Sequence, residues 1–421
     1  MSQVIRFEKI VPEGKAMGHL SDGRAVFTIG PLPDEVAEVG VRKQKKTYAE
    51  AVLRKIIEPS KHRVKEIDSH TASTAPWQGV EYPYQLELKR QMLAEAFRQH
   101  HIELSTIDFV HSDQQVGYRN RLDFTVADIE GTQQLAFHAR GSWDTLIPIK
   151  GSNLGSDRMN EAAQNLLNQL NGFGIMVTPA MITVRHARTT DQLLTILTTE
   201  AKGNWKNIDT KGLGNFLVTR PLRGSGAAGE VVYQSGNTYI TEQLAGVDIT
   251  YPYNSFFQTN TTVFEQALQK IIAAAKDHKS IVELYSGIGA IGLPLAKSGA
   301  NVRGIEIVPE AVEFAERNAR SNDITTYQAE AVAAEKMDAS ILEGTDCIIL
   351  DPPRAGLHPR VVTWILEATP KQIIYLSCNP VTQARDIALL QESYKLESVT
   401  GFDFYPGTLH LESLAILSKT R

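Results

Sequence analysis

The sequence contains little cysteine and no long hydrophobic run, and these shortages exclude several classes of protein. Cys347 and Cys378 are the only cysteines among 421 residues, too few for a disulfide framework or a cysteine-rich metal site. No apolar stretch approaches the length that spans a membrane, and the first residues, MSQVIRFE, lack the apolar segment of a signal peptide. We therefore expect a cytoplasmic protein, and a monomer by default.

An excess of positive charge is also missing. The chain has 43 Lys and Arg against 48 Asp and Glu, a net charge of -5, which argues against a uniformly basic nucleic-acid binder. A local basic face remains possible, and residues 42–65 supply one around Tyr48: Arg42, Lys43, Lys45, Lys46, Arg54, Lys55, Lys61, Arg63 and Lys65. A solvated surface would explain these charges, but beside a catalytic domain they favour RNA docking.

The hydrophobic pattern predicts three domains. Residues 1–60 contain short strands separated by turns, which is typical of a small OB-like barrel, with strands expected at 4–10, 25–29, 35–43 and 49–57. Residues 61–237 begin with a helix at 83–100 and continue as a mixed α+β domain that we expect to recognise RNA. From residue 238 onwards strand and helix signals alternate, which predicts an α/β domain with a parallel, doubly wound, Rossmann-like sheet.

A glycine-rich turn follows the first strand of this last domain. Gly287, Gly289 and Gly292 form a G-x-G-x-x-G pattern between the strand at 281–285 and a helix, where a ligand can approach the backbone closely. Glu306 ends the next strand, where a carboxylate can accept hydrogen bonds from both ribose hydroxyls. The pattern alone fits NAD and S-adenosylmethionine equally, and a purely structural turn is a further alternative.

The segment Asp351-Pro-Pro-Arg354 favours a methyltransferase. It follows the apolar strand 347–350, so Asp351 lies at the carboxyl edge of the sheet, where α/β folds bind ligands. The two prolines fix the backbone and withhold N–H groups, and such a rigid loop suits a planar base. An ordinary rigid turn is the alternative.

Cys378 lies between a predicted buried strand at 373–376 and a predicted helix at 382–390. Asn379 is a favourable helix N-cap and Pro380 suits the first helical position. The amides and dipole of a helix N-terminus stabilise a thiolate, the nucleophilic form of cysteine. An inert buried cysteine is the alternative.

An activated cysteine beside a sulfonium cofactor suits methylation of uracil C5. Carbon 5 is a weak nucleophile until a thiolate adds to C6, and a general base must afterwards remove the C5 proton. His410 and Glu412 alternate with apolar residues as on a strand, so we expect both on one face and either as the base. For Glu412 a structural hydrogen bond is an equal alternative.

Together these motifs resemble the RNA 5-methyluridine methyltransferases, which act on ribosomal RNA and tRNA. The resemblance covers nearly the whole chain. The catalytic domain of the family is matched by Val282-Glu-Leu-Tyr-Ser-Gly-Ile-Gly, Asp351-Pro-Pro-Arg-Ala-Gly, Ser377-Cys-Asn-Pro, Ala384-Arg-Asp386 and Thr408-Leu-His-Leu-Glu412. The central part is matched by Tyr118-Arg-Asn-Arg121 and Ser255-Phe-Phe-Gln-Thr-Asn260, and a TRAM barrel by Gly18-His-Leu-Ser-Asp-Gly-Arg.

The resemblance implies roles for individual residues. Cys378 would be the nucleophile and Glu412 the base. The S-adenosylmethionine site would comprise Gln258, Tyr285, Gly287, Gly289, Glu306, Glu330 and Asp351. Glu330 would face the adenine, although the usual residue there is aspartate. Arg119 and Arg121 would contact RNA, with a structural salt bridge as an equal alternative.

One departure from the family pattern predicts a missing cofactor. Many members carry a four-cysteine iron–sulfur site between the barrel and the central domain, but residues 67–78 contain no cysteine. We therefore expect a cluster-free member, in which packing around Trp77 and Tyr82 replaces the cluster.

The expected activity is methylation of uracil C5 in RNA, with ribosomal RNA favoured over tRNA. Cytosine-C5 methylation is a close alternative, although Cys347 is poorly placed as the second cysteine of such enzymes. An exocyclic-amine methyltransferase would carry an aromatic residue where Arg354 stands and would not need Cys378. A catalytically inactive RNA-binding chaperone and an NAD oxidoreductase complete the alternatives.

Overall fold

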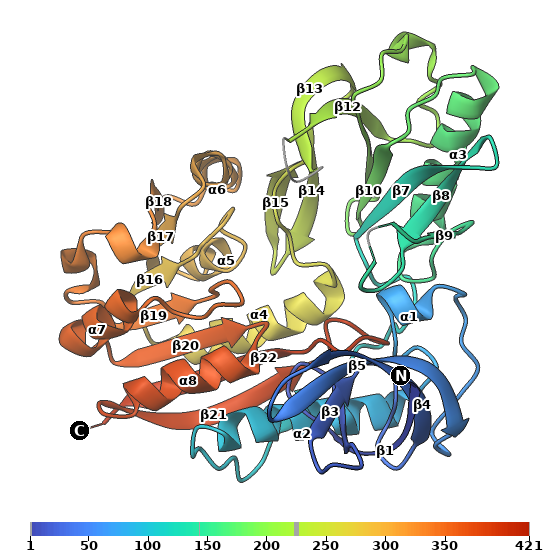
Figure 1. Cartoon of the computed structure of the whole chain (residues 1–421). Coiled ribbons are helices and arrows are strands. Elements are labelled where there is room, and N and C mark those ends of the chain that lie inside the picture. The colour runs from blue at the N-terminus through green and yellow to red at the C-terminus, as the bar shows by residue number, and fades with distance from the viewer. Residues whose placement is uncertain (1, 143, 223–226, 421) are drawn as a thin grey trace. The chain divides into compact units, whose positions relative to one another are not determined.

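The computed structural model describes residues 2–142, 144–222 and 227–420 and divides by internal contacts into two compact units (Figure 1). Unit 1 comprises residues 1–67, 74–112 and 350–421, and unit 2 comprises residues 68–73 and 113–349. Each unit therefore combines segments that are distant in sequence. The sequential division at residues 60 and 237 stays a prediction, and each unit is described by itself below.

The N-terminal part of unit 1 is a closed five-stranded barrel with the order β1-β2-β3-β5-β4. Its strands are β1 (Ser2–Ile10), β2 (Ala16–His19), β3 (Ala25–Thr28), β4 (Val36–Gln44) and β5 (Tyr48–Glu58). Ile5 and Phe7 alternate with exposed neighbours and point into the barrel core. The predicted barrel is confirmed, but β2 is an additional strand of only four residues.

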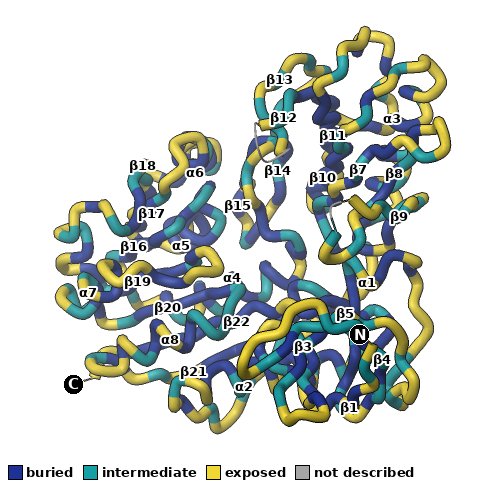
Figure 2. The backbone as a smooth tube through the Cα atoms, in the orientation of Figure 1, coloured by how far each residue is buried: buried dark blue, intermediate teal, exposed yellow. Residues whose placement is uncertain are grey.

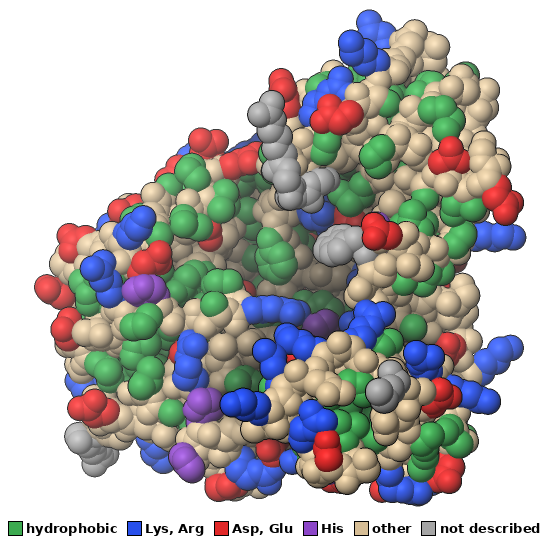
Figure 3. All heavy atoms as spheres, in the orientation of Figure 1, with side chains coloured by type: hydrophobic (Ala, Val, Ile, Leu, Met, Phe, Trp, Pro, Cys, Tyr) green, Lys and Arg blue, Asp and Glu red, His purple; other side chains and the backbone are tan. Residues whose placement is uncertain are grey.

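The basic residues of β4 and β5 stand on the outside of this barrel. Arg42, Lys43, Arg54 and Lys55 are exposed, and Lys and Arg side chains gather over the barrel face seen in Figure 3. This surface has the charge that RNA docking requires.

The remainder of unit 1 surrounds four hydrogen-bonded strands in the order β20-β22-β21-β6. The strands are β6 (Asp108–Val110), β20 (Gln372–Ser377), β21 (Tyr394–Phe402) and β22 (Glu412–Lys419), and the helices are α2 (Tyr82–Arg98), α7 (Pro359–Ala368) and α8 (Pro380–Leu390). β22 runs antiparallel to both β20 and β21. The sheet is therefore not parallel throughout, which differs from the sequence prediction. The antiparallel strand arises because a short connection returns the chain from β21 directly into β22.

Unit 2 contains a seven-stranded sheet with the order β13-β12-β11-β10-β7-β8-β9 and a separate hairpin. The strands are β7 (Arg121–Ile129), β8 (Thr132–His138), β9 (Leu146–Pro148), β10 (Ala180–Ala187), β11 (Gln192–Thr199), β12 (Asn215–Pro221) and β13 (Ala228–Ser235), followed by the hairpin β14 (Tyr239–Leu244) and β15 (Val247–Pro252). Helix α3 (Asp157–Gly172) buries Met159, Leu166 and Leu170, as its helical spacing predicts. The short helix α1 (Thr71–Thr74) falls where the chain passes between the units.

The second half of unit 2 has the alternating pattern that the sequence predicts. Its elements are α4 (Thr261–Ala275), β16 (Ser280–Leu284), α5 (Gly292–Lys297), β17 (Asn301–Glu306), α6 (Pro309–Ser321), β18 (Tyr327–Ala331) and β19 (Cys347–Leu350). The strand order is β18-β17-β16-β19, and β17 is parallel to both β16 and β18. The central strands β16 and β19 are almost entirely buried, as is the short helix α5, whereas α6 exposes much of its surface (Figure 2). Among the described residues, no helix is long and apolar enough to cross a membrane.

Candidate active site

The structure places Cys378 at the junction that the sequence predicts. β20 ends at Ser377 and α8 begins at Pro380, so Cys378 lies at the carboxyl end of a strand and before a helix. The Asn379 side chain accepts a hydrogen bond from the Val381 N–H at 3.2 Å, as an N-cap should. Cys378 itself is partly buried.

The loop that begins at Asp351 is fastened to the N-terminal end of α8. The carbonyl of Arg354 accepts hydrogen bonds from the Asn379 amide at 2.9 Å and from the Thr382 hydroxyl at 3.2 Å. One residue after Gly356, the Leu357 N–H donates to Asp386 at 2.8 Å. The rigid loop after β19 and the cysteine loop after β20 therefore form one connected structure.

The thiol of Cys378 is not predisposed to ionise, which corrects the sequence prediction. Burial, the nearby Glu412 carboxyl and Asp351 raise its pKa from the ordinary 9.0 to about 11, while the Arg354 guanidinium lowers it. The helix N-terminus is present, but desolvation and two acidic neighbours outweigh it. With a pKa of about 11 the thiol form dominates at neutral pH.

Glu412 is the first residue of β22, and its side chain is buried. Burial and Asp351 raise the pKa of its carboxyl well above the ordinary value, while Arg354 and a hydrogen bond from the Tyr405 side chain act in the opposite direction. A carboxyl whose pKa is raised by burial is a stronger base than an exposed one, which suits proton removal.

His410 does not share a face with Glu412, so that expectation is wrong. β22 begins only at Glu412, and His410 belongs to the preceding loop, where its ring is exposed. Its Nδ1 lies 3.3 Å from an Arg354 nitrogen, and its ring meets Tyr405 edge to face at 5.9 Å. Of the two candidate bases, Glu412 is the buried one beside Cys378 and Asp351.

The glycine-rich turn of unit 2 adopts backbone conformations that favour glycine. Gly287 and Gly289 have φ of 53° and 82°, and Tyr285 has φ of 65°, which is rare for a residue with a side chain. A Cβ at Gly287 would meet nothing within 4 Å, so this position borders open space. The Gly287 N–H donates to the Glu306 carboxylate at 2.9 Å, which brings two predicted cofactor residues together.

The residues after Glu306 complete a surface that fits a nucleoside. Glu306 also accepts the Val308 N–H at 2.9 Å, and a carboxylate retains further lone pairs for ribose hydroxyls. Ile307 and Val308 are 64% and 48% exposed, which is unusual for such apolar side chains beside a strand end. An exposed apolar pair beside a carboxylate can hold a purine base and a ribose.

The other predicted site residues of unit 2 have structural partners. The Glu330 carboxylate forms a salt bridge with Arg303 at 2.8 Å, and Gln258 is buried, with its backbone carbonyl accepting from the Asn120 side-chain amide at 2.8 Å. Arg121 binds Asp123 through two nitrogens at 2.9–3.1 Å, which is the salt bridge considered as the alternative to RNA contact. The Arg119 guanidinium lies 5.8 Å from the Tyr118 ring centroid.

Sequence reasoning missed two residues of the cluster around Cys378 and Glu412. It treated Arg354 only as a departure from an aromatic motif, yet Arg354 is the cation that acts on both Cys378 and Glu412. It assigned nothing to Tyr405, which hydrogen-bonds Glu412. For Arg354, its position in the Asp351-Pro-Pro-Arg segment was the available signal.

Alkylation of the ligand-free protein with iodoacetamide should test the acidity of Cys378. With a pKa of about 11 the thiolate fraction at pH 8 is about 100-fold below that of an ordinary cysteine, so the rate should still rise between pH 9 and pH 10. Glu412→Gln removes a negative neighbour and should shift the profile to lower pH. Mass spectrometry separates Cys378 from the buried Cys347. A plateau below pH 8 would restore the thiolate interpretation.

Comparison with known proteins gives consistent matches over most of the chain. The model of the family described as tRNA (Uracil-5-)-methyltransferase matches residues 81–420. An uncharacterized RNA methyltransferase of Lactobacillus johnsonii is 30% identical over 454 residues, covering 100% of this chain and 99% of the relative. One from Prochlorococcus marinus is 31% identical over 419 residues, covering 92% and 99%. The crystal structure of Pyrococcus abyssi tRNA (uracil-54, C5)-methyltransferase in complex with S-adenosyl-L-homocysteine superposes with a TM-score of 0.79 at 27% identity, covering 99% of this chain and 100% of that one.

Proposed function

The chain belongs to the tRNA (uracil-5-)-methyltransferase family, and from this premise we propose that it methylates C5 of a uridine in RNA through a covalent bond from Cys378 to C6. The observation that carries the proposal is the cluster in unit 1, where a thiol, a buried carboxyl and an arginine act on one another. These are the groups that addition to C6 and removal of the C5 proton require.

The proposed reaction begins at Cys378. Its thiol loses a proton to solvent, a step that Arg354 favours and that Glu412 and Asp351 oppose. The thiolate adds to C6, and the electron pair of the C5–C6 double bond moves towards C5 and O4. When bound, S-adenosylmethionine would supply the methyl group to C5; its S–CH3 bond would break with the electron pair on sulfur, and S-adenosylhomocysteine would leave.

Glu412 completes the reaction. Its carboxylate removes the C5 proton, the electron pair restores the C5–C6 double bond, and the Cys378 sulfur leaves C6 as a thiolate. A pKa raised by burial makes Glu412 a stronger base than an exposed carboxylate. Asp351 and Arg354 lie in the same electrostatic cluster, so both can contact the base that Cys378 attacks.

The proposed cofactor is S-adenosylmethionine, and the surface around Glu306 fits its adenosine. Gly287 offers open space over its backbone, Glu306 a carboxylate for the ribose, and Ile307 an apolar surface for adenine. We keep Gln258, Tyr285, Gly289, Glu330 and Asp351 as further proposed contacts. Glu330 would have to leave or share its salt bridge with Arg303.

Two classes of RNA are candidate substrates. The sequence prediction favours ribosomal RNA, whereas the solved relative from Pyrococcus abyssi is named as a tRNA enzyme. The exposed basic face of the barrel and Arg119 and Arg121 of unit 2 are the proposed RNA contacts. Sequence-independent phosphate contacts of this kind do not distinguish the two RNAs.

A mechanism-based trap tests the proposed function. Ribosomal RNA and tRNA pools containing 5-fluorouridine are incubated separately with the protein and S-adenosylmethionine, and a denaturing gel detects covalent complexes. Fluorine at C5 cannot leave as a proton, so we expect a stable adduct with one pool, and sequencing the trapped RNA identifies the uridine.

Two controls separate the alternatives. The same pools containing 5-fluorocytidine should give no adduct, because an adduct there would indicate cytosine-C5 methylation. Unsubstituted RNA should be methylated without accumulating adduct. If neither pool is trapped or methylated while the protein binds S-adenosylmethionine, an inactive RNA-binding protein becomes the better interpretation.

A further inference from the structure

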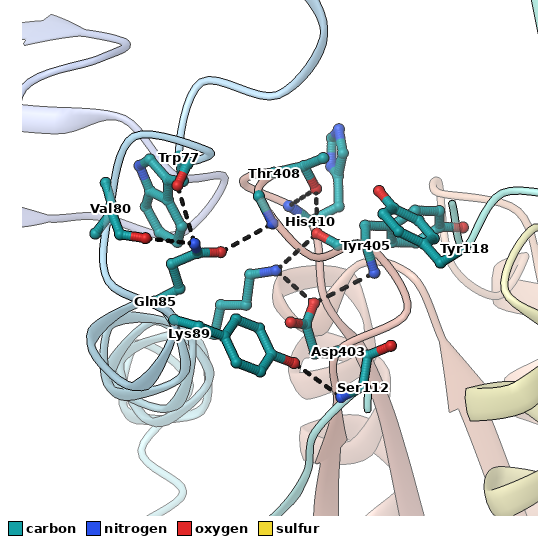
Figure 4. Close-up of polar contacts among 12 residues, drawn as sticks. Trp77, Val80, Gln85, Lys89, Ser112, Tyr118, Asp403, Tyr405, Thr408 and His410 are labelled. Carbon is teal, nitrogen blue, oxygen red and sulfur yellow. Dashed lines mark hydrogen bonds and ion pairs between the residues drawn. The ribbon is translucent and has the colours of Figure 1, made fainter. Parts of the chain in front are cut away.

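Two side chains of α2 hold the backbone of the loop that leads to Glu412. This loop, residues 403–411, joins β21 to β22, and Figure 4 shows its polar contacts. Gln85 and Lys89 are four residues apart and therefore lie on the same face of α2. Both are buried, Lys89 with 0% of its surface exposed. Buried lysines and glutamines need specific partners, and the loop supplies them.

Lys89 fixes the first part of the loop. Its Nζ lies 2.6 Å from Asp403 Oδ1 and 3.0 Å from the Tyr405 carbonyl oxygen. The same Asp403 oxygen accepts the Tyr405 N–H at 3.3 Å. Both backbone polar groups of Tyr405 are therefore tied to one buried ion pair, which limits where its side chain can point.

Gln85 fixes the turn that follows. Its Oε1 accepts the Gly407 N–H at 2.8 Å, and its Nε2 donates to the carbonyls of Trp77 at 2.9 Å and Val80 at 2.8 Å. The Trp77 N–H donates to the Gly407 carbonyl at 2.9 Å. Gly407 has φ of 73°, so the turn uses a conformation that favours glycine.

The fixed loop carries the hydrogen bond that reaches Glu412. The Thr408 hydroxyl donates to the Tyr405 carbonyl at 2.8 Å, closing the turn on itself. The Tyr405 side chain then hydrogen-bonds the Glu412 carboxyl. Cys378, in contrast, lies in a loop that Asn379 and Thr382 fasten to Arg354. The residue proposed to add to C6, Cys378, and the residue proposed to remove the C5 proton, Glu412, are therefore held in place by different contacts.

We propose that Gln85 and Lys89 are positioning residues for proton removal: they fix loop 403–411 so that Tyr405 holds the Glu412 carboxyl towards C5 of the methylated base. This inference rests on the proposed function. In the affected step the C5 proton passes to Glu412, its electron pair restores the C5–C6 double bond, and the Cys378–C6 bond breaks with its pair on sulfur. Addition to C6 and methyl transfer should be spared.

Single-turnover kinetics with methyl-labelled S-adenosylmethionine and the RNA identified by trapping test this inference. A denaturing gel separates methylated RNA still bound to protein from released RNA. In Gln85→Met, which keeps the side-chain volume, we expect release about 10- to 100-fold slower, while label enters RNA within about twofold of the wild-type rate. Tyr405→Phe removes only the Tyr405 hydroxyl that hydrogen-bonds Glu412. It should likewise slow release and leave the rate of labelling unchanged.

Controls separate positioning from general loss of structure. Gln91→Met makes the same change at an exposed position of α2 and should release product at the wild-type rate. Combining Gln85→Met with Tyr405→Phe should slow release no further than either change alone, because both act through one contact. If Gln85→Met does not fold, Gln85→Glu takes its place, because it keeps the acceptor for the Gly407 N–H and loses the Nε2 donor to Trp77 and Val80; Tyr405→Phe tests only the contact to Glu412.

The outcomes distinguish this inference from the proposed function. If the wild-type protein methylates no RNA, the proposed function fails first. If it does, and Gln85→Met and Tyr405→Phe both release product at the wild-type rate, or slow labelling and release by the same factor, the positioning role is wrong.

Discussion

Cys378→Ala should abolish RNA methylation and leave cofactor binding unchanged. Without the sulfur no bond to C6 can form, and C5 remains too weak a nucleophile to take the methyl group. Removing the nucleophile of another covalent enzyme costs on the order of 10⁶-fold in kcat, so turnover should fall below detection. Because Cys378 lies outside the proposed adenosine surface around Glu306, calorimetry with S-adenosylhomocysteine should give a Kd within about twofold of wild type.

The other cysteine supplies the matched control for this prediction. Cys347 is buried within β19, and burial raises the pKa of its thiol, so it cannot act as a nucleophile at neutral pH. Cys347→Ala should lose some stability and keep methylation and the fluorouridine adduct. Appreciable methylation by Cys378→Ala, or an adduct that survives in it, would exclude covalent catalysis through Cys378.

Most elements of the fold follow from hydrophobic periodicity, because they bury one face locally. The predicted helix at 83–100 is observed as α2, Tyr82–Arg98, and the strand at 347–350 as β19. No local pattern predicts β6, a three-residue strand that forms by pairing with β21, far along the chain. Such pairing depends on tertiary contacts that a local pattern does not contain.

The candidate site divides in the same way. Cys378, Asp351 and Glu306 stand at strand ends, and strand ends are readable from sequence. The raised pKa of Cys378 comes first from burial and then from Glu412, which belongs to a different strand. The connection from α2 through Tyr405 to Glu412 joins segments that no local pattern relates. Residue types were therefore predictable, and their charge states and supports were not.

Packing between α2 and the loop also bears on the predicted absence of an iron–sulfur cluster. Trp77 is fully buried, and its backbone binds both Gln85 and Gly407. The Tyr82 hydroxyl accepts the Ser112 N–H at 2.8 Å. The contacts of Trp77 make it part of the support for loop 403–411, and Tyr82 fastens the chain at Ser112; both are roles that ordinary packing can fill.

Glu412→Gln should accumulate the intermediate that Cys378→Ala cannot form. The amide keeps the shape of the carboxyl and can still accept the hydrogen bond from Tyr405, so addition to C6 and methyl transfer should proceed. It cannot take the C5 proton, and loss of a general base slows its step by roughly 10²- to 10⁴-fold. With unsubstituted RNA and labelled S-adenosylmethionine, a denaturing gel should show methylated RNA bound to the protein.

Glu397→Gln makes the same change at an exposed carboxylate of β21, the strand paired with β22, and should leave turnover unchanged. If Glu412→Gln turns over normally, another group removes the proton. If the variant is folded and inactive without any adduct, Glu412 acts before methyl transfer. Addition of the Cys378 thiol would then depend on Glu412, consistent with the electrostatic interaction between these two groups.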